Sequence, residues 1–146
     1  MFRGNYPNSI DIKGRCVVPA KFRHELGDRC VLAKGLDECL YLYTDEEWQK
    51  FMNTYLANFS DEDETAHDLK FFFYANSAEC DIDRQGRIKL PQDYIDYADI
   101  RKEMVNVGFV NKIEIWSKER YDDKMGSEEM KPRNLLRKIR GTEERS

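Results

Sequence analysis

The sequence lacks any long apolar run. No stretch of its 146 residues approaches the roughly 20 apolar residues that a membrane-spanning helix requires, so we expect no membrane partner. The first residues, Met1 to Asn5, contain no apolar signal segment. Their composition predicts a cytoplasmic protein.

Metal ligands are also scarce. Only His24 and His67 accompany the four cysteines, and no two cysteines form a C-x-x-C pair. This spacing argues against a zinc site, and we expect no metal or other cofactor. Free cysteines usually pack as small apolar residues. We therefore expect reduced thiols in the core at Cys16, Cys30, Cys39 and Cys80.

Catalytic motifs are missing as well. No Ser or Cys nucleophile has a suitable His partner, and the chain contains neither a G-x-S-x-G motif nor a phosphate-binding loop. The adjacent carboxylates of Asp61 and Glu62 are better explained as charges at the start of a helix. The sequence thus predicts no enzyme and no small-molecule substrate. An enzyme whose pocket the sequence does not reveal stays an alternative, and turnover by the purified protein would favour it.

What the sequence does contain is a five-residue motif that occurs twice. Residues 11–15 read D-I-K-G-R, and residues 83–87, which lie 72 positions later, read D-R-Q-G-R. Gly tolerates positive φ, and Asp hydrogen-bonds to backbone N–H groups two residues on, so each copy predicts a tight turn. The turn-forming residues are Asp11 and Gly14 in one copy and Asp83 and Gly86 in the other.

Each turn leads into the same series of elements. Alternation predicts a short strand with Arg15 or Arg87 on its outer face, and the Pro that ends the strand suits the first turn of a helix. Residues 31–35 then match residues 104–108 with a shift of 73, which indicates one inserted residue between the halves of the repeat. The inner face of the two short strands would carry Cys16, Val18, Ile88 and Leu90.

The duplication divides the chain into four parts. We expect a first repeat over residues 1–50, a helical acidic connector over 51–76, a second repeat over 77–124, and a charged tail over 125–146. Units this small make poor independent cores, so the two repeats should pack on each other as one pseudo-symmetric body. The tail has too little apolar content to fold alone, which predicts a flexible segment or a short helix that orders on contact.

Charge is distributed unevenly along the chain. The net charge is −4, which by itself argues against a nucleic-acid partner. However, residues 1–35 contain seven Lys/Arg against three Asp/Glu, whereas residues 36–69 contain ten Asp/Glu against Lys50 alone. This asymmetry predicts a basic working face and an acidic, solvated back.

The basic residues of the turns are candidate contacts to double-stranded DNA. Arg reads guanine bidentately in the major groove, which admits a two-stranded β-ribbon, so Arg15 and Arg87 are the candidate base readers. Lys13 is a natural phosphate contact, and Arg84 would take this role in the second copy, where Gln85 replaces Lys. The alternative is that each Arg only pairs with its own motif Asp and braces the turn.

The two motifs resemble the signatures of a known family. Residues 9–15 (S-I-D-I-K-G-R) with residues 19–23 (P-A-K-F-R), and residues 80–88 (C-D-I-D-R-Q-G-R-I), are similar to the signatures of MraZ, a family of bacterial transcriptional regulators related to AbrB and MazE. The resemblance covers about residues 1–123. It implies an α+β fold, mainly β with short helices, in which two tandem swapped-hairpin AbrB-like repeats form a pseudo-twofold double-split β-barrel.

The resemblance also implies a function. It predicts a nucleoid-associated regulator that binds DNA direct repeats upstream of its own gene, in the division and cell-wall gene cluster, as a homo-oligomeric ring. Arg15 and Arg87 would be the DNA contacts, with Lys13 in support. Because AbrB-like folds also serve as antitoxins, an antitoxin-like or other protein-interaction module stays an alternative, and co-purification with a small partner protein would favour it.

Overall fold

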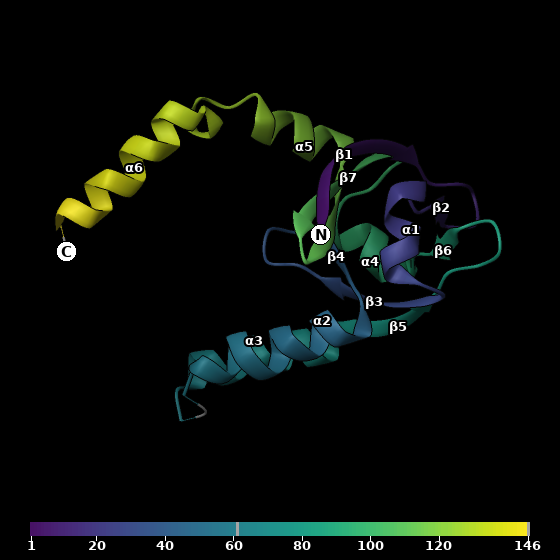
Figure 1. Ribbon diagram of the computed structural model, residues 1–146, viewed down its shortest axis with the longest axis horizontal. Coiled ribbons are helices and arrows are strands. Elements are labelled where there is room, and N and C mark those ends of the chain that lie inside the picture. Colours follow the sequence, from purple (N-terminus) through teal and green to yellow (C-terminus); the bar gives the residue numbers. More distant parts are fainter. Residues whose placement is uncertain (61, 146) are drawn as a thin grey trace.

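The computed structural model describes residues 1–60 and 62–145, so Asp61 in the connector and Ser146 at the end of the tail lie outside it. The fold is α+β, mostly sheet with several short helices (Figure 1). The strands are β1 (Phe2–Ser9), β2 (Arg15–Val17), β3 (Arg29–Lys34), β4 (Leu40–Tyr43), β5 (Ser77–Asp81), β6 (Arg87–Lys89), β7 (Glu103–Val110) and β8 (Lys112–Ser117). The helices are α1 (Ala20–Leu26), α2 (Asp45–Lys50), α3 (Glu64–Ala75), α4 (Gln92–Tyr97), α5 (Lys118–Met125) and α6 (Pro132–Arg145), with shorter helical turns η1 (Phe51–Tyr55), η2 (Leu56–Asn58) and η3 (Glu128–Met130).

The strands of the two repeats pair mainly with each other. An antiparallel six-stranded sheet has the order β1-β7-β8-β4-β3-β5, and a separate two-stranded ribbon joins β2 to β6. In the two repeats β1 corresponds to β5, β3 to β7 and β4 to β8. If each strand is replaced by its counterpart and the order is read from the opposite end, the same order results. The expected body of two repeats packed on each other is therefore present. Within the described residues the large sheet does not close on itself, since β1 and β5 are its edge strands, and the double-split β-barrel of swapped hairpins is not confirmed.

Strand pairing corrects the sequence-based alignment of the two repeats. Cys30 in β3 pairs with Cys80 in β5, and Met104 in β7 pairs with Asn8 in β1. The two partners, Asn8 and Cys80, lie 72 residues apart in equivalent strands. Cys30 is therefore the counterpart of Met104, a shift of 74 and not the 73 that the sequence suggested. Since a one-residue slip in a strand turns every side chain to the other face, the difference decides which residues of β7 face which core.

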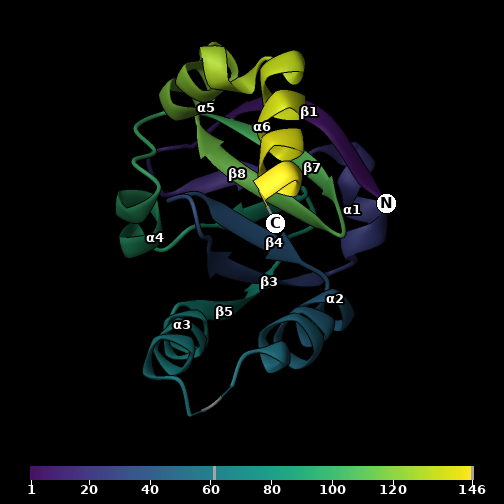
Figure 2. The same ribbon diagram turned by 90° about the vertical axis from the view of Figure 1, so that its left-hand side faces the viewer.

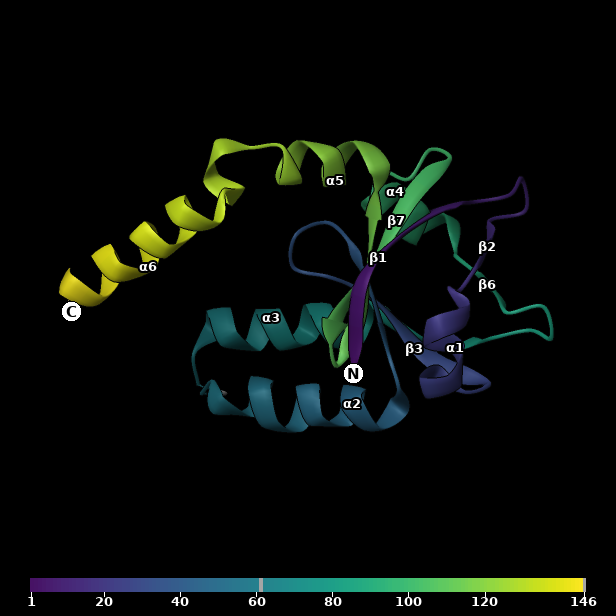
Figure 3. The same cartoon turned by 45° about the horizontal axis from the view of Figure 1, so that its top comes forward.

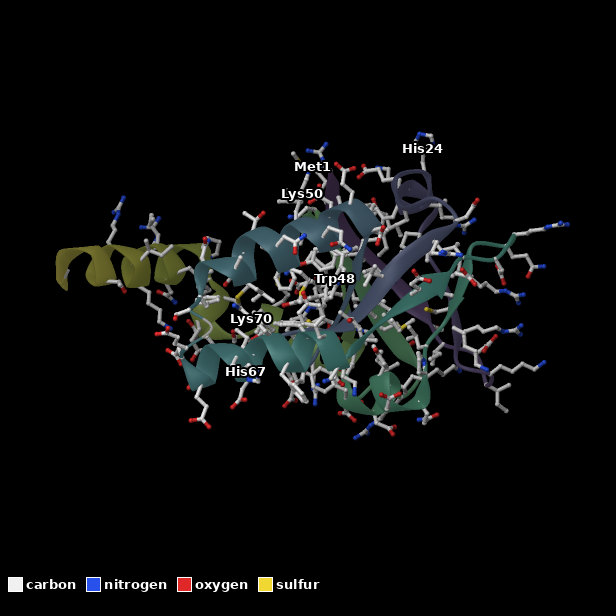
Figure 4. The ribbon with its side chains drawn as sticks, turned by 90° about the horizontal axis from the view of Figure 1, so that it is seen from below. Met1, His24, Trp48, Lys50, His67 and Lys70 are labelled. Carbon is white, nitrogen blue, oxygen red and sulfur yellow. The ribbon has the colours of Figure 1, made fainter. Side chains whose placement is uncertain are left out.

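Two apolar cores lie on opposite sides of the large sheet. One fills the space between the sheet, the ribbon, α1 and α4, and it contains Cys16, Cys30 and Ile88. The other lies beneath α2, η1 and α3, which run side by side in Figures 2 and 3. Figure 4 places Trp48 inside this second core, whereas Lys50 points outward from the same helix. All four cysteines are free and buried, as predicted.

Three helices begin at a residue whose side chain caps the helix. The side chain of Thr44 accepts a hydrogen bond from the N–H of Glu47, and that of Ser117 accepts one from Arg120. Asp63 caps α3 by accepting from Thr65 and Ala66. These bonds satisfy N–H groups that have no partner within the helix.

The charged tail contains a regular helix. The sequence predicted a flexible segment or a short helix that orders on contact, and the structure contains the helix α6 in this segment. Figure 1 shows that α6 extends away from the sheet, beyond α5. Within residues 1–60 and 62–145, no helix is both long and apolar enough to cross a bilayer.

Candidate nucleic-acid interface

The two motif turns have the same geometry. In the first turn, the Oδ1 atom of Asp11 accepts hydrogen bonds from the backbone N–H groups of Lys13 and Arg15, both at 2.9 Å. The same atom of Asp83 accepts from Gln85 at 2.9 Å and from Arg87 at 2.8 Å. Gly14 and Gly86 have φ of +80° and +78°, which favours glycine at both positions. The predicted tight turns are therefore confirmed.

Each motif arginine is held by its own aspartate. Nε of Arg15 lies 3.0 Å from Oδ2 of Asp11, and Nε of Arg87 lies 2.9 Å from Oδ2 of Asp83. The bracing contact that the sequence left open is thus present in both turns. It uses Nε only: within the described part of the chain, no hydrogen bond occupies Nη1 or Nη2 of either arginine. The side chains of Arg15 and Arg87 are 32% and 30% exposed, so both are partly accessible to solvent.

The same hydrogen bonds tune the two carboxylates. The backbone N–H of Arg15 stabilises the ionised form of Asp11 and lowers the pKa of its carboxyl, and the Arg15 side chain adds to the effect. The N–H of Arg87 lowers the pKa of Asp83 in the same way. Both carboxylates are therefore ionised at neutral pH, and they hold the turns in one conformation.

The ribbon of β2 and β6 brings three cations onto one face. Arg15 pairs across the ribbon with Lys89, and Val17 pairs with Arg87. Between them, Cys16 and Ile88 pair with their side chains buried in the core. Because side chains alternate along a strand, the outer face carries Arg15, Arg87 and Lys89 together. Lys89 was not among the predicted DNA contacts, although its spacing of two residues from Arg87 already placed it on the same face.

The turn tips carry the remaining predicted residues. Lys13 is exposed at one tip and Arg84 at the other, so the structure does not bring these two side chains onto the ribbon face. Ile12, the counterpart of Arg84, is fully exposed. Figures 1 and 3 show both turns at the end of the molecule that lies opposite α3 and α6. The candidate interface thus consists of a cationic ribbon flanked by two tips of different chemistry.

A further cation lies beside the second turn. Nε of Arg23 donates to the carbonyl oxygen of Val18 at 2.8 Å, and its guanidinium covers Gly86 so closely that a Cβ there would lie 2.2 Å from Cζ. At the equivalent place beside Gly14, α4 contributes the apolar Ile95. The second turn is therefore the more basic of the two. Sequence analysis missed Arg23 because the contact joins α1 of one repeat to the turn of the other.

Comparison with known proteins places this chain in a family. The family model described as "MraZ protein, putative antitoxin-like" matches residues 1–70 and 73–135, and each matched segment contains one of the two turns. The chain belongs to the MraZ family. The resemblance inferred from the two motifs is thereby confirmed.

Curated relatives in the MraZ family match over most of both chains. "Transcriptional regulator MraZ" of Halothermothrix orenii is 41% identical over 129 residues, which cover 88% of this chain and 90% of that relative. The proteins of the same name from Lachnoclostridium phytofermentans and Acetivibrio thermocellus are 47% and 37% identical, over 84% and 95% of this chain and 85% and 96% of theirs. The matches therefore cover more than four fifths of this chain and of each of these relatives.

Proposed function

We propose that this protein is a DNA-binding transcriptional regulator that reads double-stranded DNA with the β2–β6 ribbon and its two turns. The observation that carries the proposal is the cross-strand pairing of Arg15 with Lys89 and of Val17 with Arg87, which gathers three cations on the outer face of one ribbon. A two-stranded ribbon fits the major groove of B-DNA. The regulator names of the MraZ relatives support the same assignment.

In the proposed mechanism, each aspartate prepares its arginine for base reading. The ion pair to Nε limits the rotamers of Arg15 and Arg87, while Nη1 and Nη2 stay available to O6 and N7 of guanine. Bracing and reading are then compatible roles of the same side chain. Lys13, Arg84 and Lys89 would contact phosphates, which position a protein on DNA without specifying sequence.

The proposal extends to the operator and the assembly. Direct repeats upstream of the protein's own gene, in the division and cell-wall gene cluster, are the proposed target, and the proposed binding form is a homo-oligomeric ring in the bacterial nucleoid. Several subunits on successive repeats would gain affinity through effective concentration without new contacts. The pairing of β1 with β7 and of β5 with β3 joins strands of the two repeats and supports swapped hairpins of the AbrB type.

The proposal is tested by measuring binding to the DNA upstream of the gene, with unrelated DNA as competitor. Arg15→Ala and Arg87→Ala should each weaken specific binding by about 1–3 kcal/mol and reduce sequence preference. Lys50→Ala on α2, far from the ribbon in Figure 4, is the control and should bind like wild type. If both arginine variants fold and bind as tightly as wild type, the arginines only brace their turns. A wild type that ignores DNA and co-purifies with a small partner protein would favour the antitoxin-like module.

A further inference from the structure

The two halves of the candidate interface differ in the same sense at three pairs of equivalent positions. In each pair the residue around the first turn is apolar, and its counterpart around the second turn, 72 positions away in the sequence, is cationic. The pairs are Ile12 and Arg84 at the tips, Val17 and Lys89 on the ribbon, and Ile95 and Arg23 beside the turns. The face is therefore more apolar in its first-turn half and more cationic in its second.

Ile12 is the most exposed of these apolar side chains. It is fully exposed, and Figure 3 shows the first turn, drawn in purple between β1 and β2, projecting from the end of the molecule. An apolar side chain stabilises a fold in proportion to the area that it removes from water, and Ile12 removes none. The turn itself is held by hydrogen bonds to Asp11. Within the described chain, the isoleucine therefore contributes nothing to the fold.

Val17 extends the apolar character of this half onto the ribbon. It is 39% exposed, whereas its neighbours Cys16 and Val18 are buried, so its side chain points to the outer face. Single exposed apolar residues are common on protein surfaces. Ile12 and Val17, however, flank the candidate base reader Arg15 in the sequence. Their positions indicate a contact that belongs to DNA recognition.

The major groove offers one apolar group to such a side chain. This group is the C5-methyl of thymine, and the hydrogen-bonding edges of the other bases and the phosphates are polar. A polar group that is covered by an aliphatic side chain loses water and gains no hydrogen bond, which is unfavourable. A methyl group against an aliphatic side chain has no such cost, and both lose apolar area to water. An exposed isoleucine at the groove thus favours thymine.

We propose that Ile12 contacts the C5-methyl group of a thymine and specifies an A·T pair beside the bases that Arg15 reads. Arg84, at the equivalent tip, contacts phosphate and specifies no base. The inference rests on the proposed DNA-binding function and names a further specificity-determining residue for it. It also explains why the two tips of a duplicated unit carry different residues.

The test uses a set of upstream duplexes in which each thymine in turn is replaced by uracil. The replacement removes the C5-methyl group and leaves the hydrogen-bonding groups of the base in place. Wild type should bind about fourfold more weakly when the thymine at Ile12 is replaced, which is the effect expected for one buried methyl group. Fluorescence anisotropy at constant salt measures the change.

Ile12→Ala is the decisive variant. Because Ile12 is fully exposed, the substitution should leave Tm and assembly unchanged. The variant should bind the unmodified duplex about fourfold more weakly or worse, and it should no longer distinguish thymine from uracil at the sensitive position. Ile12→Val retains an aliphatic side chain and should keep part of the preference. This loss of discrimination separates a methyl contact from a general weakening of binding.

Arg84→Ala is the matched control, since it removes the equivalent residue at the other tip. It should weaken binding to all duplexes alike and keep the wild-type preference for thymine over uracil. Its slope of log K against log salt should be less negative by about 0.9, as expected for one lost phosphate contact. Ile12→Ala should leave that slope unchanged.

The outcomes separate this inference from the regulator proposal. If wild type prefers the upstream DNA but no replacement of thymine by uracil weakens binding, the methyl contact is refuted and the regulator proposal stands. The same conclusion holds if Ile12→Ala keeps the full wild-type sensitivity at every thymine. A wild type that binds upstream and unrelated DNA equally, or binds neither, refutes the regulator proposal and the methyl contact together.

Discussion

Substitution of Lys89 tests whether the ribbon face contacts DNA. Lys89 is exposed, lies opposite Arg15 in the ribbon and belongs to a strand whose other side packs in the core. Lys89→Gln removes one charge and keeps most of the aliphatic side chain, so the fold should be unaffected. Each phosphate that a protein neutralises contributes about −0.9 to the slope of log K against log salt.

The expected magnitude follows from the cations that the interface presents. If the five residues Lys13, Arg15, Arg84, Arg87 and Lys89 all contact phosphates, the slope should be about −4.5 per bound chain; if the arginines of the ribbon read bases, it should be about −2.7. Lys89→Gln should make either slope less negative by about 0.9. Between about 50 and about 200 mM salt, wild type should therefore lose about three- to fourfold more affinity than the variant.

The assay is fluorescence anisotropy with labelled upstream DNA over a salt series. Lys50→Gln is the matched control, since Lys50 lies on α2 and is paired with acidic neighbours. A slope that is the same for wild type and Lys89→Gln, with folding and assembly intact, would refute the assignment of the ribbon as the DNA-binding face. A change shared by both variants would show only the effect of net charge.

Three further predictions concern stability and reactivity. Phe73→Ala should lower the free energy of unfolding, measured by urea denaturation, by about 3–5 kcal/mol because Phe73 is fully buried. Phe71 is 67% exposed, so Phe71→Ala should change the free energy of unfolding by less than about 0.5 kcal/mol. Equal effects of the two substitutions would contradict the assigned core. The pKa of Asp83 is lowered in the folded protein, so its ionised form stabilises the fold fully above the unfolded pKa of about 3.8. This stabilisation is lost as the pH falls through the lower pKa of the folded state. Asp83→Asn should therefore reduce the acid dependence of Tm below about pH 4, and an unchanged Tm profile would count against the turn geometry. Burial raises the pKa of Cys16 and of Cys39 to about 12, so neither thiol should react with Ellman's reagent at pH 8 until the protein unfolds, and rapid labelling of native protein would disprove their burial.

Local chemistry made part of this structure predictable. Both turns and the inward direction of Cys16 and Ile88 depend on residues within a few positions of each other, and all were predicted from the sequence. The arginine bracing contacts belong to the same class, since Asp and Arg are four residues apart. Such contacts form whenever the local backbone forms, and so the order of residue types is enough to predict them.

The placement of the candidate site depended on tertiary structure. Arg15 meets Lys89, and Arg23 covers Gly86, only because strands and helices of one repeat pack against the other, and no local pattern specifies those pairings. The shift of 74 between Cys30 and Met104 was equally hidden, because apolar residues on both faces of a sheet buried on two sides give no alternation that marks the register. The sequence by itself therefore determined the repeated turns and their charges. The tertiary structure decided which cations share a face, because that depends on pairing between residues about 70 positions apart.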